Sequence, residues 1–190
     1  MLSNYKILRN IAILLGLCTF FWFIYELINN YKKINSDYLK ANNYFIDKEY
    51  KKALELYENI ANLDPTNLYA LEGKARSLSR IGKLEEAEGI FLLILEKDEN
   101  FLPALTNIGI LYDLKEEYNK AIFYYQKALE KDKSITKGMS WFKRFLKNIQ
   151  FKPSNIEDRL FYLKKQLKLD ASEQKLKNLD IDSRQPDFEM

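Results

Sequence analysis

The sequence predicts an all-α protein: a solenoid of helical hairpins with an N-terminal transmembrane helix and a C-terminal helical cap. Three observations predict this class. Residues of similar size recur every 34 positions, the 190-residue chain holds only six Gly and four Pro, and a long uncharged stretch precedes the first repeat. So few Gly and Pro residues leave little room for a turn-rich β fold. A single helical hairpin cannot bury its own apolar face, so the recurrence is what predicts a domain.

Six columns of residues stay in register over three units. The two small columns are Ala41, Ala75, Gly109 and Ala53, Ala87, Ala121; the larger columns are Tyr44, Leu78, Tyr112, then Tyr50, Leu84, Tyr118, then Tyr57, Phe91, Tyr125, and finally Ile60, Ile94, Ala128. We expect the small residues where the two helices of a hairpin approach closely. The aromatic column lies one helical turn after the second small column, where it would fill the space to the neighbouring unit.

A 34-residue helix-turn-helix period with this order of small and aromatic residues resembles the tetratricopeptide repeat family. Within a repeat region of residues 31–134, the three units are placed at 34–67, 68–101 and 102–134. The chain lacks the usual Trp near the start of each first helix. The closing Pro is present only at Pro65, with Glu99 and Lys133 in the equivalent places. The resemblance implies a right-handed stack of antiparallel helix pairs whose first helices line a concave groove.

Residues 1–30 are predicted to form a membrane anchor. No charged residue lies between Arg9 and Glu26, and the stretch Ile7–Ile28 has 22 residues, where about 20 are needed to cross about 30 Å of hydrocarbon. Trp22 and Tyr25 are suited to one membrane interface. The alternatives are a core helix packed on the repeats and a cleaved signal peptide. The small-x-small cleavage site of a signal peptide is not found after the apolar stretch.

The join between the apolar stretch and the repeats is predicted to be helical. Residues Asn29–Ser36 contain neither Pro nor Gly, so the anchor helix is expected to run into the first repeat. Lys residues flank the stretch on both sides, and this small bias leaves open which membrane face carries the repeats.

The repeat register ends after the third unit. Residues 135–169 are predicted to form a basic helical cap, with two apolar stripes: Met139, Phe142, Leu146, Ile149 and Ile156, Leu160, Leu163, Leu167. Ser154 with Glu157 three residues later predicts a capping box at the start of the second helix. Residues 170–190 have weak periodicity and are expected to be an extended or disordered tail.

The cap carries a strong positive charge. Ten Lys or Arg residues stand against two acidic ones between Lys133 and Lys168, and the candidate basic patch is Lys143, Arg144, Lys147, Lys164, Lys165 and Lys168. The plainest interpretation is the solvated face of two amphipathic helices. The functional alternative is contact with lipid headgroups or with a membrane-embedded partner. Nucleic acid is not expected, because the aromatic residues nearby fit packing better than base stacking.

The resemblance implies that partner contacts come from the inner face of each first helix. The candidate groove residues are Tyr38, Asn42 and Phe45, then Tyr69, Glu72, Arg76 and Arg80, then Thr106, Asn107, Ile110 and Asp113. Family members that capture the C-terminal carboxylate of chaperones use a clamp of Lys, Asn and Arg at fixed inner positions. Here only Asn42 matches that clamp, and the neighbouring places hold Tyr38, Gly73, Pro103 and Asn107. A mixed aromatic and polar groove fits an extended peptide or a helix better. Replacing Arg76 and Arg80 by Glu is expected to abolish partner capture with little change in stability.

The composition argues against catalysis. The chain has no His, and its single cysteine, Cys18, lies in the apolar stretch. The commonest general base is therefore missing, and no phosphate-binding Gly loop or metal-ligand spacing is found. We expect no enzyme activity, cofactor or metal.

The expected function is that of a membrane-anchored protein–protein interaction module. Such a module would be a scaffold or assembly factor for a membrane protein complex. The resemblance to anchored repeat proteins implies a single-pass protein of a bacterial inner membrane or a plastid-type membrane. The alternative is a permanent accessory subunit of such a complex. The partner and the oligomeric state are left open.

Overall fold

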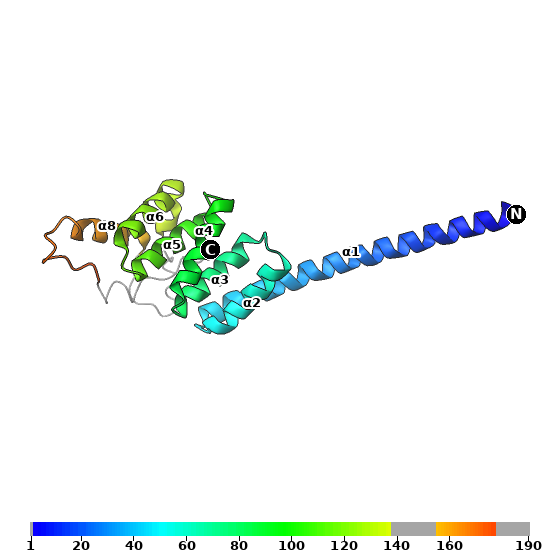
Figure 1. Ribbon diagram of the computed structural model, residues 1–190, viewed down its shortest axis with the longest axis horizontal. Coiled ribbons are helices and arrows are strands. Elements are labelled where there is room, and N and C mark those ends of the chain that lie inside the picture. Colours follow the sequence, from blue (N-terminus) through cyan, green and yellow to red (C-terminus); the bar gives the residue numbers. More distant parts are fainter. Residues whose placement is uncertain (1, 138–154, 178–190) are drawn as a thin grey trace.

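The computed structural model describes residues 2–137 and 155–177, and over these residues it contains helices and no strand, so the predicted all-α class is confirmed. The repeats use six helices in antiparallel pairs (Figure 1). Their bounds are α1 Leu2–Ile46, α2 Tyr50–Leu63, α3 Leu68–Arg80, α4 Leu84–Lys97, α5 Leu102–Leu114 and α6 Tyr118–Lys131. A short 3-10 helix, η1 Lys133–Lys137, and helix α8 Ile156–Gln166 follow.

The periodic columns form the core between the paired helices, as predicted. Ala53, Ala87 and Ala121 are fully buried, and so are the aromatic rings of the column that contains Tyr57. Two helices approach closely at Gly109, where an added Cβ would lie 2.6 Å from Cδ1 of Tyr125. That distance is too short for any side chain, so a glycine at this position lets α5 pack against α6.

The turn inside each hairpin repeats the same backbone conformation. Lys48, Gly82 and Glu116, spaced by 34 residues, have φ values of +62°, +86° and +62°. In each turn an amide donates back to a carbonyl five residues earlier, as in the bond from Lys83 N to Leu78 O at 3.0 Å. This is a helix C-terminus closed by one left-handed residue. Only the second of the three turns has a glycine, Gly82, which adopts positive φ without strain.

The turns between hairpins are closed by an aspartate column that the sequence analysis did not identify. Asp64, Asp98 and Asp132 each cap a second helix, and their carboxylates accept the backbone N–H two residues later at 3.0, 3.0 and 2.7 Å. A short acidic side chain that bonds its own backbone in this way favours a turn over helix continuation. This explains why the turn persists where the closing Pro is absent.

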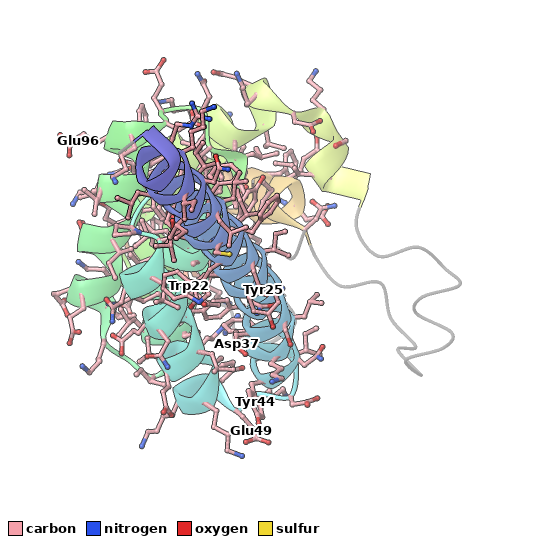
Figure 2. The ribbon with its side chains drawn as sticks, turned by 90° about the vertical axis from the view of Figure 1, so that its right-hand side faces the viewer. Trp22, Tyr25, Asp37, Tyr44, Glu49 and Glu96 are labelled. Carbon is pink, nitrogen blue, oxygen red and sulfur yellow. The ribbon has the colours of Figure 1, made fainter. Side chains whose placement is uncertain are left out.

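Helix α1 is one continuous helix that extends well beyond the repeats (Figure 1). Its segment Lys6–Asn29 has an apolar window of mean hydropathy 2.2, none of which is buried. Figure 2 looks along the molecule from the N-terminal side, with Trp22 and Tyr25 on this helix. The alternative of a core helix packed on the repeats is therefore wrong, because the segment contacts no repeat. The C-terminal part of α1 joins the core through Ala41 and Phe45.

The chain after the third repeat packs back onto it. Helix α8 contacts α6 and buries Ile156, Leu160 and Leu163. The start of this helix lies one residue later than predicted: Asn155 is the N-cap, and its capping box uses Asp158 rather than Glu157. The other predicted cap helix, around Phe142, lies outside the described residues. The tail residues 170–177 have no regular secondary structure beyond turns.

Candidate functional site: the groove of the first helices

Buried polar contacts link the first helices of the second and third repeats. Glu72 on α3 accepts a hydrogen bond from Nδ2 of Asn107 on α5 at 2.6 Å, and the same carboxylate oxygen lies 3.0 Å from Nε of Arg76. All three residues are less than 10 % exposed. Because buried polar groups are costly unless paired, this network holds α3 and α5 at one spacing.

Aromatic side chains continue the network to α1. The guanidinium carbon of Arg76 lies 4.5 Å from the ring centroid of Phe45, a cation–π contact. Asn42 accepts a hydrogen bond from the hydroxyl of Tyr57, and the ring of Tyr38 meets that of Tyr57 edge to face. Burial, together with the charge of Glu72, raises the pKa of Tyr38, so its hydroxyl stays protonated at neutral pH. The inner faces of the three first helices therefore form one connected surface.

The structure corrects two sequence-based expectations. Thr106 is fully buried and its hydroxyl donates to Leu102 O at 2.9 Å, so it faces the core and not a partner. Arg76 is held against Glu72, so replacing it by Glu would place two carboxylates together in a buried site. That change would lower stability, contrary to the expectation of a nearly unchanged melting temperature. Arg80, which is only half-buried, is the better position for a charge reversal.

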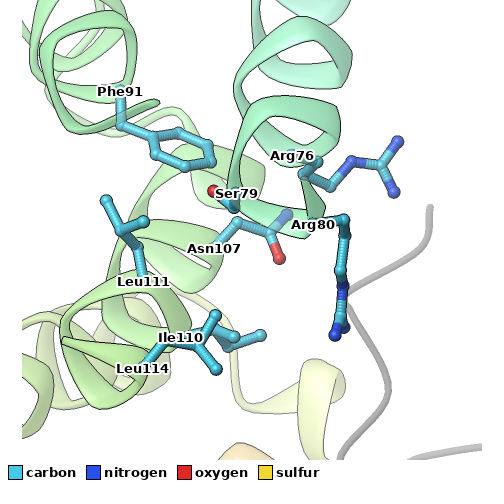
Figure 3. A pocket seen from close by; sticks show the side chains of 8 residues that line it. All are labelled: Arg76, Ser79, Arg80, Phe91, Asn107, Ile110, Leu111 and Leu114. Carbon is cyan, nitrogen blue, oxygen red and sulfur yellow. The ribbon is translucent and has the colours of Figure 1, made fainter. Parts of the chain in front are cut away.

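A small hollow lies on the groove between α3 and α5 (Figure 3). Its lining residues are Arg76, Ser79, Arg80, Phe91, Asn107, Ile110, Leu111 and Leu114. The sequence analysis did not select Ser79, Leu111 or Leu114 for the groove, and it placed Phe91 in a core column. Ser79 and Leu114 stand one 34-residue step from residues that it had selected: Ser79 from Phe45 and Asp113, and Leu114 from Arg80. Extending each selected position through all three repeats would have found them.

The remaining candidates mark the two ends of the inner face. Tyr69, at the start of α3, is 47 % exposed and packs edge to face on Phe101. Asp113, at the other end, is bound by Arg159 of α8, whose Nε and Nη2 donate to the two carboxylate oxygens at 2.7 and 2.8 Å. Asp113 also accepts from the hydroxyl of Tyr125 at 3.2 Å. The C-terminal cap thus closes this end of the groove.

The places of a carboxylate clamp are filled by internal packing. Gly73 lies against the ring of Tyr57, where a Cβ would be 2.4 Å from Cε1, and Pro103 is buried in the core. Asn42 and Asn107 both have their side-chain amides in hydrogen bonds within the chain. The residues that stand where the clamp would be therefore hold the repeats together.

The basic patch lies partly outside the described residues, which exclude Lys143, Arg144 and Lys147. Lys164, Lys165 and Lys168 are exposed on and after α8. Helix α8 lies at the end of the molecule opposite the N-terminus of α1 (Figure 1). These three lysines are therefore far from the apolar span, and contact with the headgroups beside that span is not supported.

Comparison with known proteins is consistent with the repeats seen in the structure. The family described as "Tetratricopeptide repeat" matches residues 44–107 and again residues 103–134. Hsp70-Hsp90 organizing protein 3 of Arabidopsis thaliana is 26% identical over 93 residues, which cover 49% of this chain and 17% of that protein. RNA polymerase II-associated protein 3 of Xenopus tropicalis is 25% identical over 120 residues, which cover 63% of this chain and 18% of that protein. The chain thus spans less than a fifth of the length of these relatives.

Solved structures agree on the fold. The first tetratricopeptide repeat domain of Spaghetti, bound to the HSP90 peptide SRMEEVD, superposes with a TM-score of 0.56 at 19% identity, covering 73% of this chain and 95% of that one. The first such domain of human RNA polymerase II-associated protein 3 superposes with a TM-score of 0.50 at 20% identity, covering 61% of this chain and 88% of that one. Together with the periodic core, the paired helices and the matched residues, this shows that the chain carries tetratricopeptide repeats.

Proposed function

We propose that the protein is a membrane-tethered interaction module that holds an extended peptide or a helix of a partner, as a scaffold or assembly factor for a membrane protein complex. The observation that carries this proposal is helix α1. It passes from an exposed apolar segment, Lys6–Asn29, directly into the first repeat, where Ala41 and Phe45 are buried.

The dimensions of the apolar segment support the tether. Twenty-four residues at about 1.5 Å each span about 36 Å, which exceeds the roughly 30 Å of a hydrocarbon core. Leu14, Leu15 and Phe20 are each more than half exposed, and at about 100° per residue they lie on different sides of the helix. Soluble proteins seldom expose so much contiguous apolar surface. Transfer into a bilayer removes this surface from water.

The groove supports a peptide or helix as the partner. Half-buried Arg80 lies beside Ile110 and Leu114 in the hollow, and exposed Tyr69 lies at the start of α3. This mixture of charged, apolar and aromatic side chains suits an extended or amphipathic segment. The similar domain of Spaghetti binds an HSP90 peptide. Because the clamp places here are occupied by Gly73 and Pro103, we propose that this groove selects a different peptide.

The tether is tested by a double charge substitution. Leu14→Arg/Leu17→Arg places two arginines near the middle of the span, each costing roughly 2.5–3.5 kcal/mol for insertion. Leu39→Arg/Ile46→Arg is the matched control, because both residues are exposed on the same helix within the repeats. We expect the wild type and the control to stay in the membrane pellet after alkaline carbonate extraction and the first variant to be released. Release of the wild type and the control together with the variant would overturn the tether.

The partner is tested by affinity isolation of the tagged chain after gentle detergent extraction, followed by mass spectrometry. Recovery of a defined set of membrane-complex subunits supports the proposal. Subunits that remain after a high-salt wash indicate a permanent accessory subunit, whereas loss on washing indicates a transient assembly role. Recovery of the chain alone would contradict the scaffold role.

A further inference from the structure

We infer that the turn between α2 and α3, residues 64–67, lies on the membrane surface and contacts lipid headgroups, as a second attachment beside the apolar segment of α1. This inference rests on the proposed membrane tether and deepens it, because it assigns the repeats a lipid-contacting face. Three observations carry it: the register between α1 and α2, the level at which α3 begins, and the exposed side chains at this end of the first hairpin.

Ring contacts give the register of the first hairpin. Two edge-to-face pairs join α1 to α2, Tyr38 with Tyr57 and Phe45 with Tyr50, with ring centroids 5.8 and 5.2 Å apart. The helices are antiparallel, so a step of seven residues back along α1 is matched by seven residues forward along α2. Six further residues along each helix from the first pair place Leu63, the last residue of α2, level with residue 32 of α1.

Residue 32 is close to the end of the apolar segment. The segment Lys6–Asn29 ends three residues earlier, about 4.5 Å along the helix. Its length of about 36 Å exceeds the roughly 30 Å of hydrocarbon, so a centred span ends about 3 Å beyond the hydrocarbon edge. Residue 32 is then about 7–8 Å beyond that edge, and the headgroup layer is about 5–7 Å thick. The end of α2 is therefore level with the outer headgroups.

Helix α3 begins at nearly the same level. Gly73 on α3 lies against the ring of Tyr57 on α2. Six residues along each helix from this contact lead to Leu63 and Asn67, the two ends of the turn. The turn therefore closes the pair on its membrane side. Figure 1 shows it on the side from which α1 leaves the repeats.

The side chains at this end suit the headgroup layer. Leu63 is 65 % exposed, and Tyr69, the second residue of α3, is 47 % exposed. A leucine gains free energy by leaving water, and a tyrosine combines an apolar ring with a polar hydroxyl, which enriches it at membrane interfaces. The Asp64 carboxylate accepts hydrogen bonds from the amide and the hydroxyl of Thr66 at 3.0 and 2.6 Å. Contact with lipid leaves these groups paired.

The charges of the described side chains here do not select an anionic lipid. Lys97 of α4 reaches the turn, with Nζ 3.4 Å from Pro65 O, but it stands against Asp64 and the exposed Glu96. We therefore assign the contact to apolar and hydrogen-bonding interactions with zwitterionic headgroups such as phosphatidylcholine. Attraction to anionic lipid would require an excess of cations.

The contact sets the height of the groove above the bilayer. Tyr69 lies at the bilayer end of α3, and Arg80 ends that helix eleven residues later, about 16 Å further away. A segment bound along α3 therefore lies within about 16 Å of the headgroup layer. A juxtamembrane segment of a membrane-embedded partner occupies this region, so the contact favours such a segment as the ligand of the groove.

The test places the fluorophore NBD on one side chain of the full chain in phosphatidylcholine vesicles. The test position is Leu63→Cys and the matched control is Ile46→Cys, both with Cys18→Ala. Ile46 is also apolar, is 50 % exposed and ends the first helix of the same hairpin. It lies fourteen residues beyond residue 32 of α1, about 21 Å further from the apolar segment. Lipid with a nitroxide on its headgroup quenches a fluorophore that touches the headgroup layer.

We expect the nitroxide lipid to remove most of the fluorescence at position 63 and little of it at position 46. Equal quenching at the two positions, or stronger quenching at position 46, would overturn the inference. Flotation of the labelled protein with the vesicles is measured in the same samples and judges the tether separately. Protein that floats without quenching at position 63 contradicts the surface contact and leaves the tether intact, whereas protein that does not float contradicts both.

Discussion

The close contact between α5 and α6 depends on the absence of a Cβ atom at Gly109. An added Cβ would lie 2.6 Å and 2.7 Å from Cδ1 and Cε1 of Tyr125, whereas one at Gly89 would meet nothing within 4 Å. We therefore expect Gly109→Ala to lower the free energy of unfolding by about 1–3 kcal/mol and Gly89→Ala to raise it by up to about 1 kcal/mol. Urea denaturation of both variants checks this. Equal stabilisation by the two changes would show that the rings move aside freely.

The hairpin turns offer a second test at the scale of one residue. Lys48 has a φ of +62° where the second hairpin has Gly82, and a side chain in this conformation costs roughly 1 kcal/mol. Lys48→Gly should stabilise the protein by about 0.5–1 kcal/mol. Lys51→Gly, an exposed position inside α2, should instead destabilise it by about 1 kcal/mol. Thermal melting of the two variants should shift in opposite directions, and a parallel shift would contradict the argument.

Which residues the sequence could predict depends on whether their partners share the 34-residue period. The small and aromatic columns do, and their burial was predicted correctly. Arg159 and Asp113 do not, because their partnership joins residues 46 positions apart across the end of the periodic region. Thr106 was misplaced because the third repeat is covered on both sides, so α5 has few solvated positions. The 34-residue period predicts contacts within and between repeats, but it does not predict contacts between a repeat and the C-terminal cap.

At the scale of elements, an ion pair joins α4 to α5. Glu88 accepts a hydrogen bond from the hydroxyl of Tyr112 at 2.7 Å and another from Lys115. The hydrogen bond from Lys115 holds the pKa of Glu88 below its ordinary value of 4.5, and that from Tyr112 adds to the effect. A carboxyl group with a lowered pKa in the folded state stabilises the fold above its unfolded pKa, and this stability is lost as the pH falls through the folded pKa.

We therefore expect Glu88→Gln to be less stable than the wild type at pH 7, with a gap that closes as the pH falls below 4.5. Glu96→Gln, an exposed change on the same helix, is the control and should show no such pH dependence. Urea midpoints across the range from pH 7 to pH 3 measure the gap. A gap of constant size would mean that Glu88 acts by shape and not by charge.

Element boundaries show how far local signals determine helix ends. The capping box of α8 was predicted from a Ser and a Glu but is formed by the next residues along, Asn155 and Asp158. Both pairs have the same chemistry and spacing. The choice between them comes from a tertiary contact, the bond from Asn155 Nδ2 to Thr136 O at 3.0 Å. A sequence pattern therefore locates a helix start to within a residue, and the fold selects the residue.

For the molecule as a whole, helix α1 is the mechanical link between its apolar segment and the repeats. Ile34→Pro would remove one backbone hydrogen bond from the join and cost about 3 kcal/mol locally. Spin labels at the single native Cys18 and at Glu55→Cys measure the effect by pulsed electron resonance. We expect a narrow distance distribution in the wild type and in Ile34→Ala, and a broad one in Ile34→Pro. A broad distribution in the wild type would contradict the rigid link.

A continuous helix also sets a rotation. Each residue of α1 rotates the chain by about 100° about the helix axis and advances it by about 1.5 Å. The direction in which the groove faces around this axis is therefore fixed relative to the apolar surface at Trp22. One residue added within the join would rotate the groove about a quarter of the way around the helix axis. Seven added residues would return it to within about 20° while lifting it about 10 Å. The number of residues between the apolar segment and the repeats therefore sets the direction in which the groove faces as well as its distance from that segment.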